Sequence, residues 1–406
     1  PARVISYDKE SGELVLHNYM DFDDLKDYVK ISYELTQDGL VISKDILSEF
    51  SVASHGEGKT NLKISVPENG KCYLKLIYHL KKELPLLDED HILGFDEIEV
   101  SKDDAKCKLA EKWMQKTAVD SELQVNENDT QIHIKGREFA YTIDRRTALF
   151  TEMKFAGREY LNHPMELNIW RAPTDNDMYI KAEWKKAHYD KAYTRAYTTE
   201  VVQGKHGVKI VSHASVVAET VQKILDVTIT WKIDASGKID ADIEATKDGE
   251  FPDLPRFGVR MFLNKKLSDA RYFGMGPQES YRDKHQAASH GLYRANVGDL
   301  HEDYIRPQEN GSHYDCEYVE LNNSRYGIVA SAEKAFSFNA SYYTQEELEK
   351  KTHNYELIES DSVVFCVDYA LNGIGSNSCG PVVLEQYRFD DVLFRFQFTL
   401  VPYVKG

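Results

Sequence analysis

Alternation of apolar and polar residues with a period of two is the feature that most limits the folds open to this chain. In "YVKISYEL", the side chains of Val29, Ile31, Tyr33 and Leu35 share one face, and the residues between them share the other. The same spacing recurs at Leu74, Leu76, Tyr78 and Leu80, at Val227, Ile229, Trp231 and Ile233, and at Phe394, Phe396, Phe398 and Leu400. Strands with one buried and one wet face are typical of antiparallel sheets.

Turn signals and a scarcity of helical patterns support the same fold class. Asp38-Gly39, Asn69-Gly70 and Ser236-Gly237 stand between predicted strands, where hairpin turns favour glycine. Helical spacing is confined to three stretches, 104–116, 179–195 and 344–351. Strands and helices do not alternate regularly, which argues against a (β/α)₈ barrel or a doubly wound sheet. The sequence therefore predicts a mainly β protein.

The length of 406 residues predicts more than one domain. We expect an immunoglobulin-like β-sandwich over residues 1–104, because some seven short strands fit that fold. A charged stretch over 105–120, with a helical pattern, is the predicted linker. Residues 121–406 are rich in strands and predict one very large β-sandwich or two smaller domains.

Composition excludes several classes of function. The formal net charge is −17 and the basic residues are interspersed with acids, so nucleic acid is not an expected partner. No apolar run reaches the length of about 18–20 residues that a membrane span needs. The cysteines are odd in number, far apart and never in a C-x-x-C pair: Cys72, Cys107, Cys316, Cys366 and Cys379. That spacing argues against a disulfide scaffold and a zinc site, and favours the cytoplasm.

The octapeptide "WRAPTDND", residues 170–177, combines an arginine with short acidic and amide side chains. A calcium loop of the EF-hand type would need glycine at its sixth position, where counting from Asp175 gives Ile180. A structural interpretation fits better: "LNIW" ends a strand, Pro173 breaks it, and Arg171 pairs with a carboxylate or a carbonyl. The expected cap of the following helix is Asp175, Asn176 or Asp177. Direct contact with a ligand is the alternative.

Two Pro-Gln-Glu tripeptides, in "GMGPQESYRDKHQAA" and "RPQENGSHYDCEY", place Glu279 and Glu309 thirty residues apart. A retaining glycosidase needs two carboxylates about 5–5.5 Å apart. Beside proline and turn residues, however, glutamate more often braces a loop, and we expect that role here. The nearby histidines show no metal-ligand spacing: His285, His290, His301 and His313.

The stretch "LNGIGSNSCGP", residues 371–381, predicts a loop rich in glycine and hydrogen-bonding side chains. Glycine lets a backbone approach a ligand closely, so this loop is a candidate for binding, with a plain turn as the alternative.

Taken together and in this order, "LNIWRAPTDND", "EWKKAHYDKAY", "YFGMGPQESYRDKHQAA", "YIRPQENGSHYD" and "GIGSNSCGP" resemble the C-terminal domain of family 2 β-galactosidases. The resemblance covers residues 121–406 and implies a large antiparallel supersandwich resembling galactose mutarotase. Residues 1–104 look like the immunoglobulin-like domain that precedes it in those enzymes.

The resemblance also implies what lies elsewhere. In that family both catalytic glutamates, and most magnesium and sodium ligands, lie on a central (β/α)₈ barrel, which this sequence pattern does not contain. We therefore expect no catalytic residue, no metal site and no cofactor in this chain. Mg²⁺ and Na⁺ would bind the intact enzyme through the barrel. The motif residues are expected to be structural: Arg171, Asp175, Asn176, Asp177, Glu279 and Glu309.

One functional role carries over by resemblance. In the family, the loop matching "GSNSCGP" presents a tryptophan at the mouth of the barrel, where it stacks on sugar. Here the matching position is Cys379, beside Asn377 and Ser378. Cysteine has no ring face, so that stacking would be lost.

The resulting hypothesis is a C-terminal, non-barrel part of a retaining β-galactosidase that hydrolyses terminal β-galactosides such as lactose. Its expected partners are the catalytic barrel region or a large subunit, substrate at the rim, and further copies in a homo-oligomer. The alternatives are a carbohydrate-binding module without catalysis, and a mutarotase-like epimerase using a histidine and a carboxylate from 279–315.

Overall fold

The computed structural model describes residues 1–115 and 122–405. The chain forms two compact units: residues 1–109 with 290–292, and residues 110–289 with 293–406. The division falls inside the predicted linker 105–120, where helix α2 (Lys108–Met114) forms. The last five residues of that predicted linker, 116–120, lie outside the described residues.

The first unit contains two antiparallel sheets with a shared core, as expected for an immunoglobulin-like sandwich. Val29, Ile31 and Leu35 are buried and pair with Leu80, Tyr78 and Leu74, which confirms the alternation read from the sequence. One sheet has the order β1 (Ala2–Tyr7), β2 (Glu13–Asn18), β5 (Glu57–Asn61). The other has the order β4 (Leu40–Ile46), β3 (Val29–Gln37), β6 (Cys72–Leu80), β7 (Ile92–Glu99), and α1 (Leu25–Tyr28) precedes β3.

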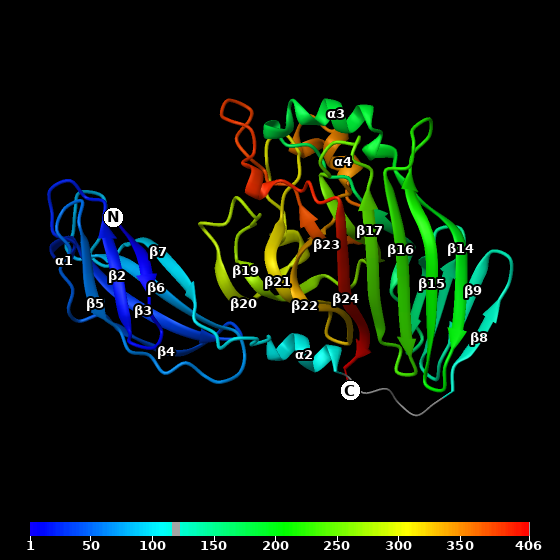
Figure 1. Cartoon of the computed structure of the whole chain (residues 1–406), viewed down its shortest axis with the longest axis horizontal. Helices are drawn as coiled ribbons and strands as arrows, with labels where there is room; N and C mark the ends of the chain where they lie inside the picture. Colours follow the sequence, from blue (N-terminus) through cyan, green and yellow to red (C-terminus); the bar gives the residue numbers. More distant parts are fainter. Residues whose placement is uncertain (116–121, 406) are drawn as a thin grey trace. The chain divides into compact units, whose positions relative to one another are not determined.

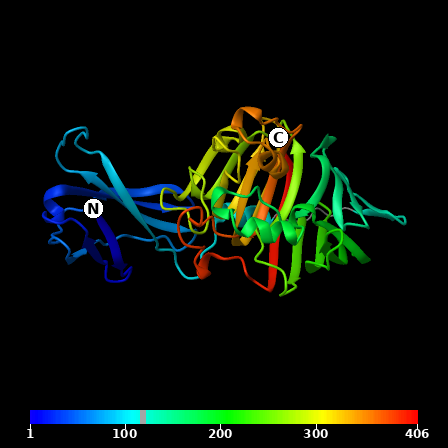
Figure 2. The ribbon, with the colours of Figure 1, turned by 90° about the horizontal axis from the view of Figure 1, so that it is seen from above.

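The second unit is built on one large antiparallel sheet, which has twelve strands within the described residues. In Figure 1 the red strand β24 lies between β22 and β17, and in Figure 2 the red strand likewise has orange strands on one side and green strands on the other. The main path runs β13 (Leu161–Asn168), β18 (Arg256–Asn264), β23 (Ser362–Leu371), β22 (Tyr326–Ser341), β24 (Leu393–Val404), β17 (Ile239–Lys247), β16 (Leu225–Asp234), β15 (Gly207–Val217), β14 (Tyr193–Gln203). Strands β19 (Asp269–Gly276), β20 (Ser289–Asn296) and β21 (Ser312–Asn322) branch from β22.

A smaller sheet covers part of one face of the large one. Its order is β12 (Arg158–Glu159), β11 (Leu149–Phe155), β10 (Phe139–Asp144), β9 (Gln131–Lys135), β8 (Gln124–Glu127). Trp231 of β16 is fully buried, packs edge-on against Phe150 of β11 and donates its indole N–H to the carbonyl of Ala148 at 2.8 Å. A large aromatic group with its polar atom satisfied holds the two sheets together, and the sandwich prediction is confirmed.

Strand β22 changes partners along its length. Its first part, Tyr326–Ser331, pairs with β24, while Ser337–Ser341 pairs with β23. The residues between, Glu333 to Ala335, are exposed. The sheet therefore opens where the neighbours of β22 part from each other.

Helices are short and lie outside the sheets. The predicted helix over 344–351 forms as α4 (Gln345–Lys350). The prediction of one helix over 179–195 is wrong at its end, because α3 covers Ile180–Lys186 and residues 193–195 begin β14. His188 has a left-handed backbone and Tyr189 turns inward to bond the carbonyl of Pro252 at 2.7 Å. The short 3₁₀ turns are η1 (Asp175–Asp177), η2 (Tyr189–Lys191), η3 (Val297–Leu300), η4 (Asn354–Glu356) and η5 (Glu385–Tyr387).

Candidate functional site

The second unit brings the sequence motifs together around one loop, residues 372–381, although they are spread over some two hundred positions. Strand β13 ends at Asn168, whose side-chain oxygen accepts the N–H of Trp170 at 3.0 Å. That turn directs Arg171 into the interior, where its side chain is fully buried. The loop is thus supported from a strand end far away in the sequence.

Arg171 is the central connection between the octapeptide and the loop. Its guanidinium donates to both carboxylate oxygens of Asp177, at 2.6 and 3.1 Å. It also donates to the carbonyl of Asn372 at 2.5 Å and to that of Gly373 at 3.1 Å. The sequence predicted that Arg171 pairs with a carboxylate or a carbonyl, and in the structure it bonds both kinds of group. One planar donor group fixes the start of the loop to the 3₁₀ turn η1.

The predicted capping of the helix by the acidic residues is wrong. Residues 175–177 form a 3₁₀ turn of their own, and the cap of α3 is Tyr179, which makes no capping bond through its side chain. The Asp177 carboxylate accepts instead from the N–H of Thr174 at 2.9 Å and from Arg171. Because the buried guanidinium occupies that carboxylate, it stabilises the turn rather than the helix.

Two further side chains hold the middle of the loop. Asn176 donates to the carbonyl of Gly375 at 2.7 Å, and its oxygen accepts the hydroxyl of Ser378 at 2.8 Å. Asp283 accepts the N–H of Ile374 at 2.9 Å and that of Gly375 at 2.7 Å. The loop is therefore anchored to "WRAPTDND" and to "ESYRDKH", and among the rim residues predicted from the sequence Ser378 bonds Asn176 directly.

Glycine is required at two of these positions. Gly375 has a left-handed φ of +64°, which disfavours residues with a side chain. A Cβ on Gly373 would lie 2.8 Å from a carboxylate oxygen of Asp283. The loop approaches its supports as closely as the backbone allows.

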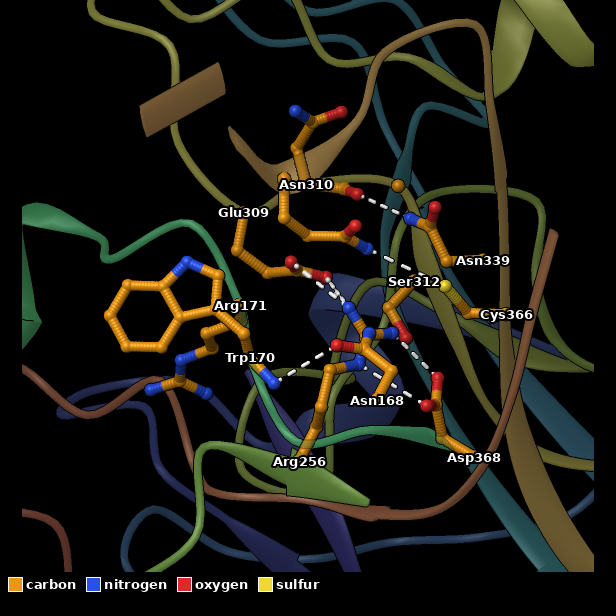
Figure 3. Close-up of polar contacts among 12 residues, drawn as sticks. Asn168, Trp170, Arg171, Arg256, Glu309, Asn310, Ser312, Asn339, Cys366 and Asp368 are labelled. Carbon is orange, nitrogen blue, oxygen red and sulfur yellow. Dashed lines mark hydrogen bonds and ion pairs between the residues drawn. The ribbon is translucent and has the colours of Figure 1, made fainter. Parts of the chain in front are cut away.

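A buried ion cluster lies behind the loop and is shown in Figure 3. Arg256 of β18 donates to the two carboxylate oxygens of Asp368 at 2.6 and 3.2 Å, and to Glu309 at 3.3 Å. All three side chains are buried. Burial opposes the charge of Arg256, but the two carboxylates raise its pKa well above the ordinary value. Burial raises the pKa of Glu309, and the attraction of Arg256 and Arg171 offsets only part of that effect.

Glu279 braces a neighbouring turn. It accepts the backbone N–H of Gly311 at 2.9 Å, the ammonium of Lys284 at 2.5 Å, and the hydroxyl of Tyr304. Glu309 is held by Arg256, and its own N–H bonds the carbonyl of Ala172 at 3.0 Å. Each carboxylate is thus occupied by partners within the chain, and this geometry suits the bracing role expected from the sequence.

Asp175 and Cys379 lie at the surface. Asp175 is exposed, and its N–H donates to the side chain of Gln308 at 3.2 Å. Cys379 is an exposed free thiol whose N–H bonds the carbonyl of Ser376 at 3.3 Å. Asn377 is half-buried in the same loop. These exposed atoms are the ones able to meet a molecule beyond the chain.

Sequence reasoning missed three residues of this cluster: Asp283, Arg256 and Asp368. Asp283 lies inside a motif that was noticed for its glutamate and histidines, so its presence there was a usable signal. Arg256 and Asp368 lie in strands β18 and β23, which are buried on both faces and carry no alternation. In such a strand, the local sign of a buried ion pair is a charged residue within an otherwise apolar run.

Exposed apolar side chains flank the loop cluster. They lie next to its motifs in the sequence and are Met178, Tyr179, Ile305, Val382 and Leu384. Ile305 precedes Arg306, which approaches Asp175 at 4.0 Å, and Val383 lies against Gly375. Several large apolar side chains left exposed near one loop are a feature of faces that another protein part covers. We call these five residues the apolar rim.

Among the described residues, no group of three or more histidine, cysteine, aspartate or glutamate side chains has the arrangement of a metal site. The helices within the same residues are too short or too polar to cross a membrane. His313, a candidate base for an epimerase, is buried with 1% of its surface exposed and stacks on Phe338. Its imidazole cannot meet a substrate in this conformation.

Comparison with known proteins places these features in a family. The family model described as beta galactosidase small chain matches residues 135–400, and the model described as beta-galactosidase, domain 4, matches residues 14–101. A beta-galactosidase of Actinobacillus pleuropneumoniae is 41% identical over 403 residues, which are 99% of this chain and 39% of that protein. A beta-galactosidase of Staphylococcus xylosus is 30% identical over 98% of this chain and 40% of its own length.

The chain therefore spans about two fifths of the length of these relatives. Among solved structures, a galactose 1-epimerase from Lactobacillus acidophilus NCFM covers 71% of this chain and 100% of its own, with 9% identity and a TM-score of 0.38. The likeness to that structure is weak, whereas the two family models match separate parts of the chain in the order expected. The chain belongs to the β-galactosidase family, with its larger unit of the small-chain type.

Proposed function

We propose that this chain is the C-terminal, non-barrel part of a retaining β-galactosidase that hydrolyses terminal β-galactosides such as lactose. The observation that carries the proposal is the match along 99% of the chain to a beta-galactosidase of which it spans 39%. The remaining part would hold the (β/α)₈ barrel with two carboxylates about 5–5.5 Å apart, as retention requires. Mg²⁺ and Na⁺, where the enzyme uses them, would bind there.

The proposed contribution of this chain is to shape the mouth of the active site. Asn377, Ser378 and Cys379 would form a rim loop at the entrance to the barrel, where the leaving sugar passes. The support for this role is the set of side chains that fix the loop, with buried Arg171 and half-buried Asn176 and Asp283 bonding its backbone or side chains. A preorganised loop orients a sugar at lower entropic cost than a loose one.

The apolar rim would dock against the barrel region or a large subunit, and intact enzyme would assemble as a homo-oligomer. The five cysteines are free thiols, which fits the proposed cytoplasmic location. A second candidate function is carbohydrate binding, which a separate cleft in the second unit supports.

An activity assay with a chromogenic β-galactoside tests the proposal. The chain alone should give no turnover above a buffer blank, and mixing it with the barrel-containing remainder of the enzyme should restore hydrolysis. A test variant is the chain carrying Asp283→Ala, which removes two loop bonds and should raise the KM of the reconstituted enzyme more than it lowers kcat. Turnover by the chain alone would overturn the assignment of catalysis to the missing part.

A further inference from the structure

The opening in the large sheet forms a cleft in the second unit with a volume of about 630 Å³. It lies where β22 leaves β24 after Ser331 and joins β23 at Ser337. Ligand pockets commonly measure about 300–1,000 Å³, so this cleft is large enough for a small organic molecule. The loop proposal makes no use of it.

One wall of the cleft is a polar sheet surface. The register places Asp240 opposite Thr399 and Asp242 opposite Gln397 on neighbouring strands β17 and β24. The hydroxyl of Thr399 donates to Asp240 at 2.7 Å, and Arg395 donates to both oxygens of Asp242 at 2.6 and 2.7 Å. These bonds hold the side chains in place, so the donors and acceptors are oriented before any ligand arrives.

The other wall carries aromatic rings that are also fixed. Tyr369, half-buried at the end of β23, stacks on Phe394 with ring centres 5.0 Å apart. Tyr314 of β21 is also half-buried, and its ring stacks on that of His285 with ring centres 5.8 Å apart. The next residue, Asp315, has a left-handed φ of 55° where the register of β21 shifts. Because of this irregularity, the neighbouring side chains of Tyr314 and Asp315 both line the cleft. Partly exposed ring faces supply apolar contact beside polar groups.

The lining charges are mixed. In the described part of the chain, five carboxylates and four cations line the cleft, namely Asp240, Asp242, Asp315, Glu333 and Asp391 with Lys232, Arg282, Lys334 and Arg395. A site for phosphate or another anion would concentrate cations, and a site for a cation would concentrate carboxylates. Closely interspersed charges offer many donors and acceptors with little net field. That combination, with aromatic faces, suits a neutral molecule that carries many hydroxyl groups.

We propose that the cleft between β22, β23 and β24 binds a neutral oligosaccharide of two or three sugar units. Sugar hydroxyls would bond the polar wall around Asp242, Gln397 and Thr399, and a ring would lie against Tyr369 or Tyr314. This binding needs only residues of this chain. It is therefore independent of the barrel and of the proposed hydrolysis.

Titration of the 406-residue chain with lactose and with maltotriose, followed by calorimetry and saturation-transfer NMR, tests the proposal. Gln397→Ala and Tyr369→Ala should each weaken binding about five- to tenfold, the loss expected for one hydrogen-bonding or stacking partner. The matched control is Asp226→Ala, which removes an exposed pair with Lys223 elsewhere on the sheet and should bind as the parent does. Ser378→Ala in the rim loop tests the competing location, because sugar bound at that loop would be lost in this variant. Circular dichroism checks that each variant is folded.

Glucuronate, an anionic sugar, should bind more weakly than lactose at the same concentration. Three results would each overturn the proposal: no binding of either neutral sugar at millimolar concentration, unchanged affinity in both cleft variants, or loss of binding in Ser378→Ala alone. The last result would move sugar recognition to the rim loop. Because none of these measurements involves hydrolysis, failure here leaves the proposed enzymatic role to its own test.

Discussion

At the scale of single residues, a few buried charged side chains stabilise the loop 372–381 and the segments around it. Arg256 is buried between Asp368 and Glu309, and Arg171 is buried beside Asp177. A buried ion is costly unless every partner is present, because water can no longer solvate it. Each arginine therefore stabilises the fold mainly because its removal would leave buried carboxylates without a counter-charge.

Arg256→Ala should lower the free energy of unfolding by about 3–5 kcal/mol, because Asp368 and Glu309 would stay buried without a counter-charge. Urea denaturation followed by circular dichroism measures the change. Arg395→Ala is the control, since the Arg395–Asp242 pair has the same fork geometry but its arginine side chain is 53% exposed. Solvent screening should make that change small. Equal losses in the two variants would contradict the role assigned to burial.

His313 should make stability depend on pH. Burial lowers its pKa from 6.5 to about 4, so the unfolded chain takes up a proton at a higher pH than the folded chain. The histidine's contribution is present above pH 6.5 and is lost as pH falls toward 4. Between pH values of about 7.5 and about 5, the loss should be about 2 kcal/mol in the free energy of unfolding.

His313→Asn keeps a donor near the carbonyl of Met275, which His313 approaches at 3.3 Å, but cannot titrate. Urea denaturation at both pH values should show a smaller decrease for this variant than for the parent chain. The comparison of differences removes the contribution of the other acidic groups, which both proteins share. An identical decrease in the two proteins would rule out His313 as its source.

At the scale of elements, the loop 372–381 has no regular secondary structure but is held by side chains from other segments. The loop 372–381 receives bonds from Arg171 and Asn176, which lie in the octapeptide 170–177, and from Asp283, which lies between β19 and β20. Its two glycines with close approaches leave no room for side chains. Bonds from outside the loop therefore add to the bonds that residues 376–381 make among themselves.

Asp283→Ala should therefore loosen the loop without unfolding the sheets. The amide hydrogens of Ile374 and Gly375 lose a charged acceptor, and their exchange with solvent should speed up about tenfold. Hydrogen exchange followed by NMR or mass spectrometry measures this. Asp299→Ala, at an exposed position in η3, should leave the loop amides unchanged. Unchanged exchange in Asp283→Ala would mean that the other supports suffice.

At the scale of the whole molecule, the chain is about two fifths of the length of its relatives. The apolar rim lies beside the motif loop, and its side chains are among the exposed large apolar ones, with Ile305 78% exposed and Leu384 59% exposed. If the proposed barrel covers this surface, those residues become buried on assembly.

Leu384→Ser should weaken association with the barrel-containing remainder about tenfold, because it removes apolar surface that the interface would bury. Surface plasmon resonance with the immobilised remainder measures the affinity. Leu86→Ser in the first unit is the matched control, since Leu86 is likewise an exposed leucine. Equal affinity in the two variants would place the interface elsewhere.

Much of the fold was predictable from local patterns, because alternation follows directly from strand geometry. The buried positions of β3, β6, β16 and β24 include the residues selected by their spacing, except Tyr33, which is half-buried. The helix over 179–195 was overestimated, since its second half is broken by Tyr189 bonding a segment sixty residues away. Strands β18 and β23 gave no alternating signal because both of their faces are buried.

By itself, the sequence determined the class of fold, the run of short strands, and the motifs that mark the family, since each depends on neighbours along the chain. Only the tertiary structure decided that Arg171 meets Asn372, that Arg256 meets both Asp368 and Glu309, and that β22 opens a cleft. Those contacts join residues tens to hundreds of positions apart. They arise from how the sheets pack, and no local pattern in one sequence encodes which distant charges will share a buried space.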